Sequence, residues 1–100
     1  MQISKKTINK NIEAEIYNIF YQIACDLENP QEAKEVLEAL LGKTEVIVAA
    51  KRLAIAHYLE KGRSYQNIKD NLKVSSATIS AVDKQRGSKG YQIALIKNSK

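Results

Sequence analysis

Residues 64–84 read SYQNIKDNLKVSSATISAVDK, and they hold the clearest structural pattern in this chain of 100 residues. The first nine of them predict a short helix. Ser64 is a preferred N-cap residue, because its side chain can accept a hydrogen bond from a free backbone N–H of the first turn. Ile68 and Leu72 are four positions apart, so both lie on one face of that helix.

The second half of the stretch predicts a turn and another helix. Residues 73–75 form the turn, and its central residue, Val74, is apolar and packs between the two helices. One of the two consecutive serines at 75 and 76 caps a helix over 76–84, whose inward face is Ile79 and Val82. A short helix, a three-residue turn and a second helix are the pattern of a helix-turn-helix.

Two lysines depart from the usual form of this motif. Lys73 occupies the turn position that glycine usually fills, so it must adopt a positive φ or the turn must differ. Lys69 occupies a position that usually holds a small residue for close packing of the two helices. The pattern is therefore a helix-turn-helix with two atypical positions.

The outward side of the second helix favours DNA binding. Ser76, Ala77, Ser80 and Lys84 project away from the inward pair, and three of the four are small. Small side chains let a helix approach the floor of the major groove closely. There a serine hydroxyl can address several bases, and an alanine methyl can contact the methyl group of thymine. Free N–H groups at the helix N-terminus can contact phosphates.

Other residues of the motif are expected to contact the DNA backbone. Gln66 and Lys69 lie on the first helix, and Lys73, Arg86 and Lys89 add positive charge around the second. The predicted DNA-binding residues are therefore Gln66, Lys69, Lys73, Ser75, Ser76, Ala77, Ser80, Lys84 and Arg86.

The charge distribution agrees with this interpretation. The net charge of the chain is +5. Residues 1–62 carry eight Lys or Arg and nine Asp or Glu, a net charge of −1, whereas residues 63–100 carry eight and two, a net charge of +6. All of the excess positive charge thus lies in the last third of the chain, where it can replace the counterions of DNA phosphates. A solvated lysine-rich tail would have the same composition.

Three helices are predicted ahead of the motif. Apolar residues spaced by three and four predict a helix over 11–27. Asn29 and Pro30 are typical N-cap and first-turn residues of a helix over 30–41, which Gly42 ends. Thr44 is then the predicted N-cap of a helix that reaches Lys61. Because that third helix is apolar on nearly every side, we expect it in the centre of the structure or between two subunits.

The two ends of the chain are less regular. Residues 1–10 have no strong periodicity and are predicted to be a mobile arm. Residues 91–96 either form a short helix that packs on a partner or fray. The expected architecture is therefore a single all-α domain over residues 1–100 with five to six helices, in which 11–62 are dimerisation helices, 64–86 the helix-turn-helix and 87–100 a C-terminal element.

Several classes of protein are excluded by what the sequence lacks. The single Cys25 lies in an apolar run and reads as a buried, inert thiol, so no disulfide framework is expected. Residues 1–10 are followed by no apolar signal segment, and no apolar run approaches the length of a membrane span, so a cytoplasmic protein is expected. His57 has no ligand partners at suitable spacing and reads as a packed histidine. With no catalytic constellation either, we expect no enzyme, no metal and no cofactor.

Four segments also resemble a known family. LAIAHYLEKG (53–62), SYQNI (64–68), VSSATIS (74–80) and GSKGY (87–91) are similar to the Trp repressor family, and most similar to its short YerC/YecD-type branch. The resemblance implies an all-α, intertwined homodimer in which the two subunits exchange their N-terminal helices. It also implies that each half presents a recognition helix to double-stranded DNA. The family's DNA contacts would correspond to Gln66, Lys69, Ser75, Ser76, Ala77 and Ser80.

The resemblance fails at the position of the co-repressor pocket. In tryptophan-responsive members two arginines enclose the indole ring, and a glycine leaves room beside the second. Arg52 and Thr78 match that pocket, but Ala81 replaces the second arginine, Val82 the glycine and Gly42 a threonine. Tryptophan binding is therefore not expected. Ala81 also departs from the short branch, which usually has arginine at this position.

Two functions remain open at this level. The first is a dimeric transcriptional regulator that binds a pseudo-palindromic site. The second is a helical protein-interaction module that docks an acidic partner through the basic third of the chain and exposed tyrosines, namely Tyr17, Tyr21, Tyr58, Tyr65 and Tyr91.

Overall fold

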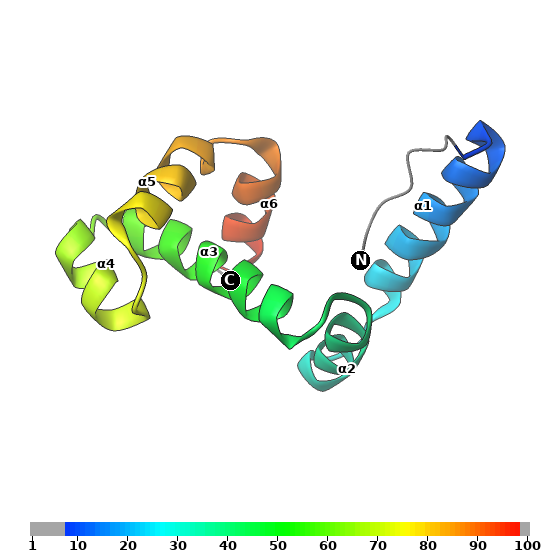
Figure 1. Ribbon diagram of the computed structural model, residues 1–100, viewed down its shortest axis with the longest axis horizontal. Coiled ribbons are helices and arrows are strands. Elements are labelled where there is room, and N and C mark those ends of the chain that lie inside the picture. The colour runs from blue at the N-terminus through cyan, green and yellow to red at the C-terminus, as the bar shows by residue number, and fades with distance from the viewer. Residues whose placement is uncertain (1–7, 99–100) are drawn as a thin grey trace. The chain divides into compact units, whose positions relative to one another are not determined.

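The computed structural model describes residues 8–98, and within that range it contains six helices and no strand. The helices are α1 (Lys10–Asp26), α2 (Pro30–Leu41), α3 (Lys43–Glu60), α4 (Tyr65–Leu72), α5 (Ser76–Gln85) and α6 (Lys89–Asn98), as labelled in Figure 1. The predicted all-α fold class is confirmed. Most of the mobile arm predicted over residues 1–10 lies outside the described residues, and Lys10 already belongs to α1.

The chain divides into two compact units after Leu40. We call residues 1–40 the N-terminal unit and residues 41–100 the C-terminal unit. In the N-terminal unit, Asn9 caps α1 by accepting a hydrogen bond from the backbone N–H of Asn11 at 2.8 Å. Asn29 caps α2 in the same way, through the N–H of Glu32 at 2.8 Å. Both helices begin where asparagine offers a side-chain oxygen to a free N–H.

The amphipathic stripe of α1 is exposed. Ile12, Ile16, Ile19, Phe20 and Ile23 follow the predicted spacing, yet each is at least 40% exposed. No residue of α1 or α2 is buried. Cys25 is exposed as well, so the prediction of a buried thiol is wrong for the single chain. The apolar pattern was identified correctly, but the part of this chain that the structure describes does not cover it.

The start of α3 corrects one predicted cap. Gly42, with φ 87°, is the N-cap residue, and its carbonyl accepts the first intrahelical bond from the N–H of Val46. Thr44 therefore lies inside the helix. Glycine suits this joint, because a residue with a side chain rarely adopts such a φ and a single residue separates α2 from α3. At the other end Lys61 is the C-cap, and Gly62 follows with φ 77°.

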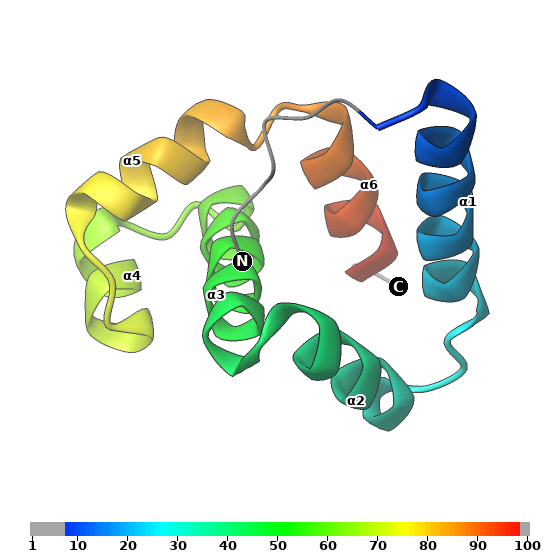
Figure 2. The same cartoon turned by 45° about the vertical axis from the view of Figure 1, so that its right-hand side comes forward.

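The core of the C-terminal unit forms around α3. This helix contacts α4, α5 and α6, and α4 also contacts α5. Figure 2 shows α3 between α4 on one side and α6 on the other. The buried side chains come from all four helices and are Ile55, Ala56, Ile68, Ile79, Val82 and Leu95. The predicted inward residues of the helix-turn-helix are thus confirmed, as is the central place of the third helix within this unit.

The C-terminal element forms a regular helix. Residues 91–96, whose conformation was open, lie within α6. Leu95 is buried, and Tyr91 packs against the same core. The side-chain amide of Gln92 donates to the backbone carbonyl of Arg86 at 2.6 Å, which joins the end of α5 to α6. Among the described helices, none combines the length and the hydropathy needed to cross a membrane.

Candidate nucleic-acid interface

Both helices of the predicted helix-turn-helix begin at a serine. The Ser64 hydroxyl accepts from the N–H of Asn67 at 3.1 Å, and the Ser75 hydroxyl accepts from the N–H of Thr78 at 3.2 Å. Ser75 is therefore the cap of α5, and Ser76 is its first helical residue. Each cap satisfies one N–H that helix geometry leaves free, which defines where the helix starts.

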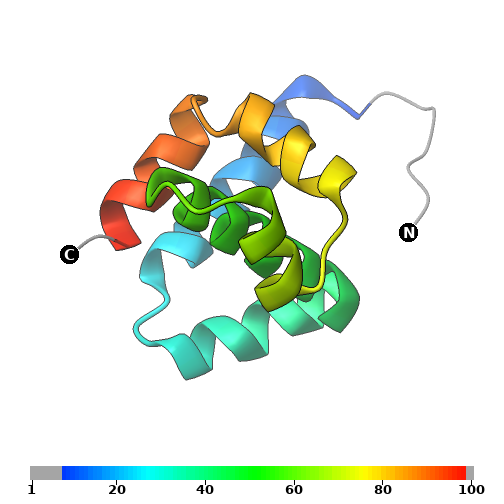
Figure 3. The ribbon, with the colours of Figure 1, turned by 90° about the vertical axis from the view of Figure 1, so that its left-hand side faces the viewer.

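The turn between α4 and α5, seen in Figure 3, contains the positive φ that was one of the two alternatives for Lys73. Lys73 has φ 55° and ψ 53°, and it is the only residue other than glycine with a positive φ in the described part of the chain. Its N–H donates to the carbonyl of Lys69 at 2.9 Å, closing α4. Val74 is half-buried and packs against the core. Packing of Val74 thus holds the turn although lysine, not glycine, occupies the left-handed position.

The exposed surface of α5 agrees only partly with the prediction. Ser76, Ala77 and Lys84 are exposed, as expected, but Ser80 is half-buried on the side of Tyr65. Three further residues of α5 are exposed and were not among the predicted contacts, namely Thr78, Ala81 and Gln85. Ala77, Ala81 and Lys84 follow at helical spacing, so they form one ridge of small residues ending in a cation. Helical spacing from Ile79 and Val82 alone could have identified Ala81.

The predicted contacts on α4 lie in different environments. Gln66 is exposed, and its amide donates to Asp70 one turn along the helix at 2.8 Å. Lys69 is half-buried. Because a lysine side chain has a long apolar stem, it can pack that stem beside α5 and still present its ammonium group to solvent. This explains how the motif accommodates lysine where a small residue is usual.

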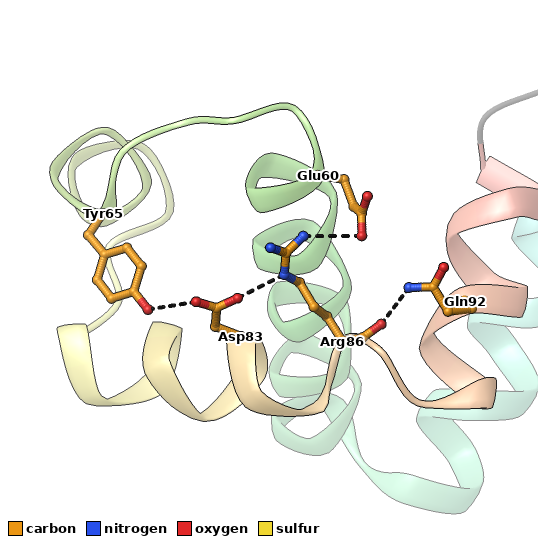
Figure 4. A network of polar contacts seen from close by, with 5 residues as sticks. All are labelled: Glu60, Tyr65, Asp83, Arg86 and Gln92. Atoms are coloured by element: carbon orange, nitrogen blue, oxygen red, sulfur yellow. Dashed lines mark hydrogen bonds and ion pairs between the residues drawn. The ribbon is translucent and has the colours of Figure 1, made fainter.

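Arg86 belongs to a polar network that Figure 4 shows. Its guanidinium donates to Asp83 at 2.8 Å and to Glu60 of α3 at 3.1 Å. The hydroxyl of Tyr65, on α4, donates to the other oxygen of Asp83 at 3.1 Å. The network therefore joins α3, α4 and α5 on one side of the core. Arg86 is 32% exposed and already has two carboxylate partners, unlike a lysine free to contact a phosphate.

The groups of the network shift one another's pKa values. The Arg86 guanidinium, followed by the Tyr65 hydroxyl, holds the pKa of Asp83 below its ordinary value of 3.8. Partial desolvation raises the pKa of Tyr65 above 10.0, and the hydrogen bond to Asp83 raises it further. The bond to Asp83 also raises the pKa of Arg86. All three groups therefore keep their ordinary charge near neutral pH, which keeps the network intact.

The residues that resemble a co-repressor pocket do come together. Arg52, Thr78, Ala81 and Val82 line one groove of about 320 Å³ between α3, α5 and α6. Tyr91 of α6 lines the same groove. Val82 is only 3% exposed, so its side chain belongs to the core beneath the groove. The groove contains one guanidinium, and an alanine occupies the position of the second.

Three of the five tyrosines considered for partner docking are engaged in the fold, and one of them is Tyr65, whose hydroxyl donates to Asp83. Tyr58 is half-buried, with the Arg63 guanidinium 4.2 Å from its ring centre, and Tyr91 packs on the core. Both were expected to be exposed, and that expectation is wrong. Tyr17 and Tyr21 are exposed and stack on each other along α1, with ring centres 6.1 Å apart. No group of three or more metal-ligating side chains occurs among the described residues.

Comparison with known proteins agrees with this geometry. No curated protein matches the chain. The model of the family described as Trp repressor protein matches residues 14–99, which is most of the chain and includes all of α2 to α6. Since that family consists of helix-turn-helix DNA-binding regulators, the match accounts for the capped pair α4 and α5 around a common core. The chain belongs to the Trp repressor family.

Proposed function

We propose that this chain is a sequence-specific DNA-binding transcriptional regulator that acts as a homodimer and does not respond to tryptophan. The observation that carries the proposal is the ridge of small residues on α5, presented by a capped helix-turn-helix with a closed core. A helix with small side chains on its outer face can lie deep in the major groove. A helical hairpin with a purely structural role would not need small residues along the exposed face of its second helix.

The recognition helix would read bases through its exposed face. Ser76 would hydrogen-bond base edges, and the methyl group of Ala77 would contact thymine methyl groups. Ser80, half-buried beside Tyr65, would reach a base edge only with the exposed part of its side chain. Gln66, Lys69, Lys73 and Ser75 would contact phosphates and set the register. The exposure of Ala81 adds it to the candidate contacts, and Lys84 extends the same ridge toward the DNA backbone.

Arg86 takes a different role in this proposal. Its guanidinium is engaged with Asp83 and Glu60, and breaking both pairs to reach a phosphate would leave two carboxylates uncompensated. We therefore assign Arg86 to holding α5 against α3, and not to contacting DNA directly.

A homodimer would cover the apolar surface that the single chain exposes. The stripe on α1 lies between 40% and 55% exposed, and Ile47, Ile93 and Ile96 of the C-terminal unit are more than 50% exposed. Large exposed apolar side chains in such numbers usually mark an interface. Exchange of N-terminal helices between two subunits would bury it. Two recognition helices would then address half-sites roughly 34–36 Å apart.

Independence from tryptophan is inferred from the groove beside α5. A planar indole enclosed by two guanidinium groups needs both arginines, and here Arg52 faces Ala81. Tyr91 also lines this groove. Within the family, the GSKGY element at 87–91 favours the short YerC/YecD-type branch. We place the protein in the cytoplasm, as expected for a regulator of this kind, and propose no catalytic role for it.

Selection of bound sequences from a random duplex library tests the proposal directly. The expected result is a palindromic motif whose half-sites are one helical turn apart, with affinity unchanged by added tryptophan. Replacing Ser76 and Ser80 with alanine should flatten the sequence preference, whereas Lys69→Ala should weaken binding to all duplexes alike.

Failure to bind any duplex at micromolar protein and low salt would refute the proposal. Recovery of one stoichiometric protein partner from nuclease-treated lysate, together with that failure, would favour the interaction module instead. Enhancement of binding by tryptophan would refute only the part of the proposal that concerns the groove.

A further inference from the structure

A second groove adjoins the one between α3, α5 and α6, because Arg52 and Thr78 line both. It has a volume of about 370 Å³ and separates α3 from the turn that leads into α5. Lys51 and Arg52 of α3 line one wall, and Lys73 and Ser75 line the other together with Thr78. Two valines, Val48 and Val74, complete the lining. The groove is thus formed by side chains that are distant in sequence and brought together by the fold.

The charge of this groove is of one sign. Three of its seven lining residues are cations, and none is an acid. Both ion pairs found among the described residues are formed by Arg86, and they involve none of Lys51, Arg52 and Lys73. Lys51 is half-buried and lines the groove, so part of its side chain packs there while its ammonium group can stay hydrated at the groove's edge. Three like charges around one groove repel one another, and an anion placed between them would remove that cost.

The remaining lining residues favour an anion with several acceptor oxygens. Ser75 and Thr78 carry hydroxyl groups 3.0 Å apart at the start of α5. The first turn of this ten-residue helix also has N–H groups without an intrahelical acceptor, so its positive end adds to the field of the three cations. Hydroxyl donors, N–H donors and cations together match a phosphate group better than they match a carboxylate side chain.

The position of the groove identifies the source of the phosphate. Ser75 and Thr78 flank Ser76 and Ala77, which are proposed to enter the major groove. A strand whose bases meet those two residues must pass its backbone close to the start of α5. A phosphate of the bound DNA would therefore arrive at this groove in the same encounter.

We propose that the groove between α3 and the helix-turn-helix turn is a docking site for one phosphate of the DNA backbone in each half-site, with Lys51 as a contact residue outside the helix-turn-helix. The inference rests on the proposed function. It adds to that function a third point of attachment, carried by the central helix α3, besides α4 and α5. Such a point would fix the angle at which α5 enters the major groove.

The test measures binding of the full chain to its selected duplex as a function of salt. In Lys51→Gln the side chain keeps most of its stem and loses its charge. The slope of log affinity against log salt should become shallower by about 0.9 for each subunit, and low-salt affinity should fall by about three- to tenfold for specific and random duplexes alike. The matched control is Lys97→Gln on α6, which removes the same charge from an exposed position and should change neither quantity.

A second measurement locates the phosphate. Single phosphates of the duplex are replaced, one at a time, by neutral methylphosphonates. One replacement in each half-site should weaken binding of the unmodified protein while leaving binding of Lys51→Gln almost unchanged, because the partner charge is already absent. Inorganic phosphate at millimolar concentration should compete no better than sulfate at equal ionic strength, which separates a backbone phosphate from a site for free phosphate.

The outcomes distinguish this inference from the proposed function. If the unmodified protein binds no duplex, the proposed function fails and the docking site fails with it. If the unmodified protein binds, but Lys51→Gln has the same salt slope as Lys97→Gln and no methylphosphonate shows the non-additive effect, the docking site alone is overturned. Specific competition by inorganic phosphate would overturn the assignment to DNA.

Discussion

Both units of this chain contain helices with an apolar face, but only the C-terminal unit buries apolar side chains of those helices. In the C-terminal unit, Ile55, Ile68 and Ile79 are fully buried, although α4 and α5 are short helices of eight and ten residues. In the N-terminal unit, α1 is 17 residues long and carries a regular apolar stripe, yet none of its residues is buried. Regular periodicity therefore identifies a face that needs covering, but it does not identify the surface that covers it.

The difference has a physical basis in what each unit can bury. Helices of this length are marginal in water and draw most of their stability from the burial of an apolar face. In the C-terminal unit, α4, α5 and α6 all pack against α3, and α4 also packs against α5, so each helix has neighbours that cover its inward residues. No residue of α1 is buried within its own unit, so we expect the C-terminal unit to be stable by itself and the stripe of α1 to be covered in the proposed dimer.

The largest expected effect concerns the stripe of α1. The double variant Ile16→Asp, Phe20→Asp should convert the dimer to a monomer in sedimentation equilibrium. Full burial of such a side chain contributes about 1.5–3 kcal/mol, and four of them are affected in a dimer. Because Ile16 is 48% and Phe20 40% exposed in the single chain, the apolar burial lost is about 3–5 kcal/mol, and burial of the new carboxylates adds to the cost. This corresponds to more than about 100-fold in dissociation constant.

The matched control for that variant is Asn18→Asp, which adds a charge on the opposite side of α1 and should leave the dimer intact. Helicity of the C-terminal unit should survive in the double variant. Two results would contradict this contrast between the units. One is an unsubstituted protein that is monomeric at every concentration, and the other is a double variant that still dimerises.

A smaller effect comes from one identical substitution made in each unit. Ile79→Ala removes a fully buried side chain and should lower the free energy of unfolding by about 2–5 kcal/mol. Ile19→Ala removes a side chain that is 55% exposed in the single chain. Measured by urea denaturation at concentrations where the dimer has dissociated, it should cost less than about 0.5 kcal/mol. Equal costs at the two positions would show that α1 is covered within the chain.

The smallest effect concerns the polar network of the C-terminal unit. Because the folded-state pKa of Asp83 lies below its ordinary value of 3.8, the stability that its charge provides is present above that pH and is lost as the pH falls through the folded-state pKa. The unfolding temperature of Asp83→Asn should therefore be lower by a few degrees at most near neutral pH, and the difference should vanish in acid.

Asp70→Asn is the control for this measurement, because it removes the same charge from an exposed carboxylate on α4 that accepts a hydrogen bond from Gln66. The two variants should behave differently near neutral pH and alike only once the pH lies below the folded-state pKa of Asp83, which is itself lower than 3.8. A constant difference between the unmodified protein and Asp83→Asn down to the lowest pH would mean that the Asp83 charge is not what stabilises the network.

Much of the local structure could be predicted from the sequence. Caps at Ser64 and Asn29 involve side chains close in sequence to the N–H groups they satisfy, so the pattern alone reveals them. At two positions the pattern left alternatives that the structure decides: Ser75 and not Ser76 caps α5, and Lys73 has a positive φ. Thr44 was misassigned because the joint between α2 and α3 is a single glycine, and the pattern does not distinguish a cap at 42 from a cap at 44.

The candidate site was less predictable, because it depends on distances between helices. Arg86 reads as a free cation in the sequence, but its partners Asp83 and Glu60 include a residue 26 positions away. Lys51 gave no signal at all, since its role depends on a groove shared with Lys73. Ser80 was placed outward by helical spacing, whereas its half-buried state follows from the nearness of Tyr65 on another helix.

The sequence by itself determined the first five helices, the helix-turn-helix that α4 and α5 form and the basic C-terminal third, because each follows from residue type and short-range spacing, but it left α6 open. The tertiary structure alone decided which charges are already paired, which are left around an open groove, and which apolar face stays uncovered. The physical reason is that hydrogen bonds within a helix are local, whereas burial and ion pairing depend on residues that only the packing of α3 against α4, α5 and α6 brings together.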